Sequence, residues 1–262
     1  MTTPPDFDAL TCTLEGDVAV VRLQRAAKRN ALSDGLILAL RHTFEHLPAQ
    51  ARAAVLCGEG EHFCAGLDLA ELRERDAVEG LHHSRMWHQA FEAIEHGRVP
   101  VVAALHGAVV GGGLELASAC HLRVADDTAY FALPEGSRGI FVGGSGAVRI
   151  PRLIGVARML DMMLTGRVLD VQEAERAGLV QYRTAAGQAL PRALELAQRI
   201  ARNAPMTNYA LMHALPRIAE QAADHGLFTE ALMAAIAQSA PEAKTRLRDF
   251  LEGRAAKVRK DG

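Results

Sequence analysis

The stretch from His106 to Cys120 constrains the fold more than any other part of this 262-residue sequence. It follows an apolar run, Val99–Leu105, that has the length and the branched side chains of a buried strand. Three consecutive glycines then lead into small residues that tolerate a helix, Leu114–Ala119. The order strand, glycine turn, helix predicts an α/β unit. The glycines leave the first N–H groups of that helix open to negative charge.

Glu115 lies at the start of this predicted helix, among leucines and alanines. A carboxylate in apolar surroundings is costly unless its charge or its proton is used. The glycine turn is therefore the first candidate for polar chemistry in this chain.

The composition excludes several classes of protein. With 49% hydrophobic and 23% charged residues the chain is typical of a globular protein with one large domain, or one domain and a small appendage. A net charge of −2 gives no electrostatic footprint for nucleic acid. The four cysteines lack C-x-x-C spacing, so neither a metal site nor a disulfide framework is predicted. No apolar run approaches the ~18 residues of a membrane span, and the polar N-terminal residues do not resemble a signal peptide. We therefore expect a cytoplasmic protein with no membrane and no nucleic-acid partner.

The pattern on both sides of the central stretch alternates between strands and helices. The predicted elements are a hairpin (Leu10–Leu14 and Asp17–Leu23), a helix capped by Ser33, a strand (Ala53–Cys57), one or two helices between Asp68 and Gly97 that bury Leu69, Leu72, Leu81, Trp87, Phe91 and Ile94, strands at Leu122–Ala125 and Ala129–Leu133, helices near Val156–Leu164 and Arg167–Ala177, and a strand at Leu179–Tyr182.

Strand signals end at residue 190. Four helices are predicted beyond it, at Leu190–Asn203, Asn208–Ala222, Leu227–Ser239 and Glu242–Lys257. The sequence thus predicts an α/β fold with a core over residues 1–189 and a C-terminal helical region over residues 190–262.

Three short motifs have simpler interpretations than the functions they suggest. Gly143–Ala147 differs from a G-x-S-x-G nucleophile elbow at its last position, and a glycine-rich turn explains it. The three glycines after Val110 lack the spacing of a dinucleotide-binding turn. His82 and His83 are adjacent, so they face different sides of a helix and do not predict a metal site.

Glu115 and Glu135 form a more informative pair. Glu135 follows Pro134 at the end of a predicted strand, where catalytic groups are common. Two carboxylates that share a pocket separate their apparent pKa values, so that one serves as acid and the other as base. The alternative is two unrelated carboxylates, each paired with an arginine, and the spacing alone leaves both interpretations open.

Four segments carry a resemblance to a known family. Phe63–Asp68 is similar to the F-x-A-G-x-D loop of the crotonase (enoyl-CoA hydratase/isomerase) superfamily, and His106–Leu116 to its N-G-x-x-x-G-G-G-x-E-L segment. Pro134–Gly146 resembles its P-E-x-x-x-G-x-x-P-G-x-G-G run, and Leu164–Val180 its following helix pair. The resemblance implies a spiral of strand–strand–helix repeats and a C-terminal helical region that builds a homotrimer or a hexamer.

The resemblance also implies roles for individual residues. Backbone N–H groups of Ala65 and Gly112 match the family's oxyanion hole, and Glu115 and Glu135 match its two hydratase glutamates. Gly143 matches a glycine beside the catalytic water. The residues that match the segments lining the coenzyme A tether are Arg25, Ala26, Lys28, Ala65, Gly66, Leu67 and Asp68.

The sequence departs from the family pattern at several places. Ala26 and Val142 stand where prolines are usual, His106 where an asparagine is usual, and Ser145 where a glycine is usual. The residues around Glu71–Asp76, Trp87 and Pro134–Gly144 resemble those of methylthioacryloyl-CoA hydratases.

We therefore expect an enzyme that adds water to the α,β double bond of a short acyl-CoA thioester, with methylthioacryloyl-CoA as the narrower candidate. In that case thiol release and thioester hydrolysis would follow hydration. Coenzyme A is then part of the substrate, and neither a separate cofactor nor a metal is expected. The alternatives are an isomerase or hydrolase of the same fold, and a non-catalytic relative that binds CoA or RNA.

Overall fold

The structure is a computed structural model that describes residues 3–71 and 73–254. The chain divides into two compact units, Met1–Ala201 and Arg202–Gly262. Within the described residues, no helix combines the length and the apolar content needed to cross a membrane.

The first unit alternates strands and helices. Its elements are β1 (Leu10–Glu15), β2 (Val18–Leu23), α1 (Asp34–Glu45), β3 (Ala53–Gly58), α2 (Ala77–Glu95), β4 (Val101–Leu105), β5 (Ala108–Val110), α3 (Gly112–Ser118), β6 (Leu122–Asp126), β7 (Tyr130–Ala132), α4 (Gly146–Ile154), α5 (Val156–Thr165), β8 (Leu169–Asp170), α6 (Val171–Ala177), β9 (Tyr182–Thr184) and α7 (Ala189–Ala201). Single 3₁₀ turns occur at Phe7–Ala9, Ala26–Lys28, Leu69–Glu71 and Gly136–Arg138.

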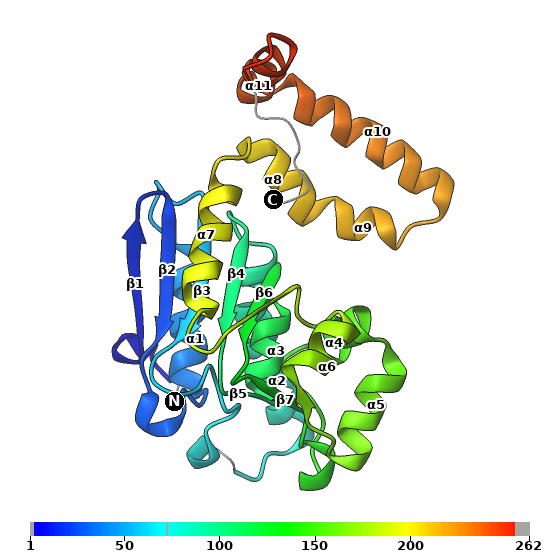
Figure 1. Cartoon of the computed structure of the whole chain (residues 1–262). Helices are drawn as coiled ribbons and strands as arrows, with labels where there is room; N and C mark the ends of the chain where they lie inside the picture. Colours follow the sequence, from blue (N-terminus) through cyan, green and yellow to red (C-terminus); the bar gives the residue numbers. More distant parts are fainter. Residues whose placement is uncertain (1–2, 72, 255–262) are drawn as a thin grey trace. The chain divides into compact units, whose positions relative to one another are not determined.

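Two sheets organise this unit (Figure 1). The larger has the order β1-β2-β3-β4-β6-β9, with β1 and β2 antiparallel and the other pairs parallel. The smaller has the order β5-β7-β8. In two successive repeats, β4-β5-α3 and β6-β7-α4, the first strand joins the larger sheet and the second joins the smaller. This is the strand–strand–helix arrangement that the sequence predicted.

The central strands β2, β3 and β4 of the larger sheet are buried on both faces, because they are almost entirely apolar. On one face Val20, Val55 and Val102 pack with α7, which Figure 1 shows in yellow across the strands. On the other face Val21 and Leu56 belong to the core that also holds residues of α1, α2 and α3. The site described below is built on this second face.

In the second unit, the regular elements of residues 202–254 are all helices. They are α8 (Pro205–His213), α9 (Leu215–Ala219), α10 (Ala223–Ser239) and α11 (Pro241–Leu251). Their large apolar side chains are mostly exposed, among them Leu211, Leu215, Leu227, Phe228, Leu232 and Ile236.

Most predicted elements are confirmed, including the hairpin and the cap of α1, where Ser33 Oγ accepts a hydrogen bond from Leu36 N at 3.3 Å. The short strands β5 and β8 were not predicted, and β8 occupies part of a predicted helix. The helix expected to continue to Lys257 ends at Leu251, with Glu252 as its C-cap, and Lys257 itself lies outside the described residues.

Two predicted core residues and one boundary are corrected. Leu69 and Leu81 are 65% and 60% exposed, because Leu69 lies in a 3₁₀ turn and Leu81 on the outer face of α2. Leu72 lies outside the described residues. The sequence placed α7 in the C-terminal region, but Ala193 and Ala197 of α7 pack on the sheet, so this helix belongs to the first unit.

Candidate active site

Glu115 is held in the first turn of α3. Gly111 precedes this helix with φ of +52°, a left-handed conformation that favours glycine. Glu115 is only 3% exposed, and its Oε1 atom accepts hydrogen bonds from Gly144 N at 2.9 Å and Gly146 N at 2.7 Å. Two backbone donors from a distant turn therefore fix the direction of this carboxylate.

Burial raises the pKa of Glu115 to about 7. The N–H groups of Gly146 and Gly144 oppose this effect because they stabilise the ionised form, whereas the nearby charge of Glu135 raises the pKa further. The carboxyl group can therefore change its protonation state near neutral pH.

Glu135 stands at the start of the loop that follows β7. It is 8% exposed, and among the described residues its buried Oε2 atom has no hydrogen-bond partner. Burial raises its pKa as well. A Cβ atom on Gly111 would lie 2.6 Å from Glu135 Oε1, so the glycine leaves the space that this carboxylate occupies.

The two glutamates line one cavity of about 380 Å³, together with Gly112, Gly143 and Trp87. Neither carboxylate forms an ion pair with an arginine among the described residues. The structure thus brings the predicted pair together, and the interpretation as unrelated, separately paired carboxylates is wrong. Trp87 packs closely here: a Cβ on Gly112 would lie 2.8 Å from its ring.

The predicted backbone donors need one correction. The N–H of Ala65 donates to Arg29 O at 3.0 Å and is therefore occupied. Leu67 N and Gly112 N have no acceptor among the described residues, and both residues line the glutamate cavity. Leu32 pairs with the strand segment around Leu67 through the carbonyl of Gly66 and the N–H of Asp68, which leaves the N–H of Leu67 unused.

A second predicted segment, Arg25–Arg29 (the basic loop), is tied to the loop Phe63–Asp68. Arg25 Nη2 and Lys28 Nζ lie 2.7 Å and 3.0 Å from Asp68 Oδ2. Although burial raises the pKa of Asp68, hydrogen bonds from Arg25, Ala70 N and Lys28 hold it at about 2. Asp68 therefore serves as an anchor between two loops, and Ala26 is exposed on the first of them.

Two more cavities extend the glutamate cavity toward the basic loop. One, of about 90 Å³, is lined by Ala65, Gly66 and Gly112, with Glu135 at its edge. The other, of about 440 Å³, includes Lys28 and Arg29 together with Ala65. Leu67 lines all three cavities, which places the basic residues, the free N–H groups and the glutamates along one groove.

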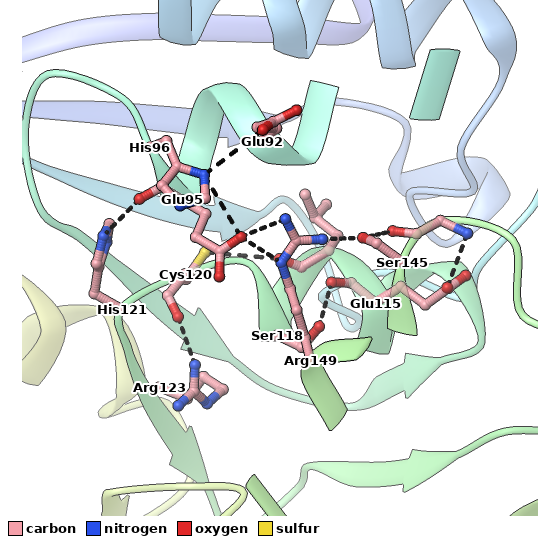
Figure 2. A network of polar contacts seen from close by, with 12 residues as sticks. Glu92, Glu95, His96, Glu115, Ser118, Cys120, His121, Arg123, Ser145 and Arg149 are labelled. Atoms are coloured by element: carbon pink, nitrogen blue, oxygen red, sulfur yellow. Dashed lines mark hydrogen bonds and ion pairs between the residues drawn. The ribbon is translucent and has the colours of Figure 1, made fainter. Parts of the chain in front are cut away.

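Sequence reasoning missed a set of polar residues behind Glu115. Figure 2 shows Ser145 and Arg149 beside the turn that binds Glu115, with Glu95 on their far side. Only the departure at Ser145 was visible in the sequence, and it gave no indication of these contacts. Among the described residues, no group of three or more His, Cys, Asp or Glu side chains could hold a metal ion.

The sequence matches the family profile described as enoyl-CoA hydratase/isomerase over residues 13–260. A 2,3-dehydroadipyl-CoA hydratase of Escherichia coli is 32% identical over 239 residues, which cover 90% of this chain and 93% of the relative. A short-chain-enoyl-CoA hydratase of Clostridium acetobutylicum is 33% identical over 195 residues, 73% of this chain and 75% of the relative.

Solved structures agree with these sequence matches. A Rhodopseudomonas palustris protein solved as a candidate enoyl-CoA hydratase is 57% identical, with a TM-score of 0.94 and coverage of 98% of this chain and 100% of that one. An enoyl-CoA hydratase of Bacillus anthracis is 30% identical, with a TM-score of 0.88 and coverage of 95% and 98%.

Proposed function

Because the chain belongs to the enoyl-CoA hydratase/isomerase family, that is, to the enzymes of the crotonase type, we propose that it adds water across the α,β double bond of a short acyl-CoA thioester. The observation that carries this proposal is the pair of buried carboxyls with raised pKa values in one cavity, Glu115 and Glu135, beside two unused backbone N–H groups.

The thioester carbonyl binds between the N–H groups of Leu67 and Gly112. Hydrogen bonds to this oxygen stabilise the negative charge that develops on it when the β-carbon is attacked. Because the double bond is conjugated with the carbonyl, the same hydrogen bonds make the β-carbon more electrophilic. Gly66 allows this close approach: a Cβ there would lie 3.3 Å from Gly112 N.

Glu115 and Glu135 hold the water and one proton between them. The ionised carboxylate takes a proton from the water as its oxygen bonds to the β-carbon, and the protonated carboxyl gives its proton to the α-carbon. The number of protons on the pair is unchanged by the reaction.

The coenzyme A part of the substrate lies toward the basic loop. Lys28 and Arg29 line the cavity at that end of the groove, where their charges attract phosphate groups. Leu67 and Gly66 lie between this cavity and the glutamates, which suits the pantetheine arm.

The acyl group enters the glutamate cavity, whose volume of about 380 Å³ suits a short chain. We propose methylthioacryloyl-CoA as one such substrate, on the resemblance around Pro134–Gly144 and Trp87. Water addition to its β-carbon gives a hemithioacetal, which breaks its C–S bond to release methanethiol and leaves an aldehyde. Hydrolysis of the thioester could then follow in the same pocket.

A panel of enoyl-CoA thioesters tests the proposal. Hydration removes the ultraviolet absorbance of the conjugated enoyl group, and a thiol reagent detects methanethiol once free coenzyme A is subtracted. Turnover of crotonyl-CoA without methanethiol from methylthioacryloyl-CoA would support the general activity and contradict the narrower substrate. Isomerisation of a β,γ-enoyl thioester with no hydration of either substrate would contradict water addition.

We also propose that the protein assembles as a homotrimer, or as a hexamer of two trimers. The C-terminal unit leaves a large apolar surface exposed, including Phe228 and Leu232, which is unusual for a monomer. Light scattering at micromolar concentration tests this, because a monomer would contradict it.

A further inference from the structure

The turn that binds Glu115 is held in an unusual backbone conformation. Ser145 stands between the two donor residues, Gly144 and Gly146, with φ of +83° and ψ of 6°. This left-handed region is unfavourable for a residue with a side chain, so a surrounding contact must stabilise it. A glycine would adopt this conformation without strain. The hydroxyl group of Ser145 is therefore the first place to look for contacts that stabilise the turn.

The hydroxyl group of Ser145 joins the turn to Arg149. Arg149 Nη1 donates to Ser145 Oγ, and this hydroxyl donates to the carbonyl of Gly144. The bond to the Gly144 carbonyl lies one peptide away from the N–H that binds Glu115. A chain of contacts therefore leads from the guanidinium group of Arg149 to Glu115 (Figure 2).

Arg149 is itself anchored on α2. Its side chain is 9% exposed, and its Nε and Nη2 atoms lie 2.8 Å and 2.5 Å from Glu95 Oε2. The same helix carries Phe91 and Trp87, whose rings would lie 2.9 Å and 3.0 Å from a Cβ on Gly144. One face of α2 thus fixes the turn through packing and, one turn further along, through the ion pair.

We propose that Arg149 is a positioning residue for the hydration reaction: anchored on Glu95, it holds the Ser145 turn so that Gly144 and Gly146 keep their N–H groups on Glu115. Its catalytic consequence rests on the function proposed above. Arg149 itself does not line the cavity and so does not touch the substrate.

The charge of Arg149 also reaches Glu115. Glu135 faces Glu115 across the cavity and raises its pKa, whereas Arg149 and the N–H groups of Gly146 and Gly144 lower it. From α2, Glu95 is paired with Arg149, and Trp87 and Phe91 are apolar neighbours. The guanidinium group of Arg149 therefore favours the ionised form of Glu115.

A titration that needs no substrate tests the positioning role. Infrared spectra recorded against pH would follow the carboxyl band of Glu115, identified by its loss in Glu115→Gln. In Arg149→Met we expect the apparent pKa of this carboxyl to rise on the order of one pH unit. Arg152→Met is the matched control, because it removes an exposed arginine from the same helix, and its shift should be much smaller.

Kinetics with crotonyl-CoA provide the second readout. Arg149→Met should lower kcat by about 10- to 100-fold with a much smaller change in KM, and the kinetic pKa that belongs to Glu115 should rise as well. Arg149→Lys, which keeps the charge, should restore part of the pKa and of kcat. Ser145→Ala and Ser145→Gly remove the hydroxyl group that joins Arg149 to the Gly144 carbonyl, but they leave the ion pair of Arg149 with Glu95. They therefore test the proposal even if Arg149→Met does not fold.

Three outcomes would overturn the proposal. The first is a Glu115 titration in Arg149→Met that matches that of Arg152→Met. The second is full kcat in both Ser145 variants. The third is a lower melting temperature in Arg149→Met with no change in the Glu115 titration. This result would mean that Arg149 only stabilises the packing of α2 against α4. If the wild-type protein hydrates no enoyl thioester, the proposed function fails, while the infrared titration still decides the role of Arg149.

Discussion

The two walls of the glutamate cavity are built differently. Glu115 lies in a helix, receives two backbone hydrogen bonds and has behind it the partly buried ion pair of Arg149 with Glu95. Glu135 lies in a loop that continues as a single 3₁₀ turn, Gly136–Arg138, whose residues are exposed, and its Oε2 atom has no partner among the described residues. Two chemically identical side chains thus differ in the backbone that carries them and in the hydrogen bonds that they receive.

Removing either carboxylate should have the largest effect on turnover. Glu115→Gln and Glu135→Gln should each lower kcat for hydration by on the order of 10²–10⁴-fold, because each loses a group that transfers a proton. Binding of a saturated acyl-CoA, measured by calorimetry, should change little. The double variant should be no worse than the poorer single variant, since both act in one unit. Additive losses would show that the two walls act independently.

Loss of the backbone N–H group of Leu67 or Gly112 should have the second-largest effect on turnover. Replacing Leu67 with the corresponding α-hydroxy acid turns its N–H into an ester oxygen and should lower kcat by about 10²–10³-fold. Replacing Gly112 with glycolic acid removes the other donor without adding a Cβ beside Trp87, and it should have a similar effect. The matched control is the same backbone change at Ala65, whose N–H donates to Arg29: it should lower the melting temperature more than kcat. The reverse pattern would restore Ala65 as the donor.

The pH dependence of the free energy of unfolding should report the raised pKa of Glu115. The folded protein holds the Glu115 proton up to pH about 7, whereas the unfolded chain loses it near 4.5. The stabilisation from this proton is complete below pH 4.5 and is lost as pH rises through 7. Glu115→Gln should therefore be more stable than wild type at pH 8, by about 3 kcal/mol in the free energy of unfolding, and similar at pH 4. Urea unfolding at both pH values measures this, and an equal difference at both would contradict the raised pKa.

The smallest effect on kinetics should come from Lys28, which does not line the glutamate cavity. Lys28 is half exposed in its ion pair with Asp68, and such pairs contribute about 0–1 kcal/mol. Lys28→Ala should raise KM for acyl-CoA a few-fold at low salt and less at high salt, because screening weakens the attraction to phosphate. A large fall in kcat would contradict this expectation, and would mean that the basic loop helps to position Glu115 or Glu135.

Sequence reasoning found the residues of the site more easily than their contacts. The glycine turn and Glu115 were visible because an apolar strand, three glycines and a helix leave a local pattern. Ala65 was the wrong donor because the choice between it and Leu67 depends on where Leu32 and Arg29 lie in space. The strand β5 is three residues long and exists through its pairing with β7, so no local periodicity could indicate it.

The role of Arg149 was hidden for the same reason. Its partner Glu95 lies 54 residues earlier, on another helix, so no local pattern links the two. Ser145 is four residues before Arg149, but this common helical spacing does not show that the serine in turn contacts the Gly144 carbonyl. Leu81 shows the opposite error, because it fits the helical periodicity of the predicted segment and is nevertheless exposed. Burial depends on what covers a helix face, which the sequence of that helix does not contain.

The ties of Asp68 to Arg25 and Lys28 have a thermodynamic consequence for ligand entry. They join two loops far apart in the chain before any ligand arrives. A ligand that slides along this groove therefore does not have to immobilise the loops itself, and less of its interaction energy is lost to ordering the protein. Weak contacts along the ligand can then suffice for binding. Ligand binding should therefore cause only a small loss of protein conformational entropy.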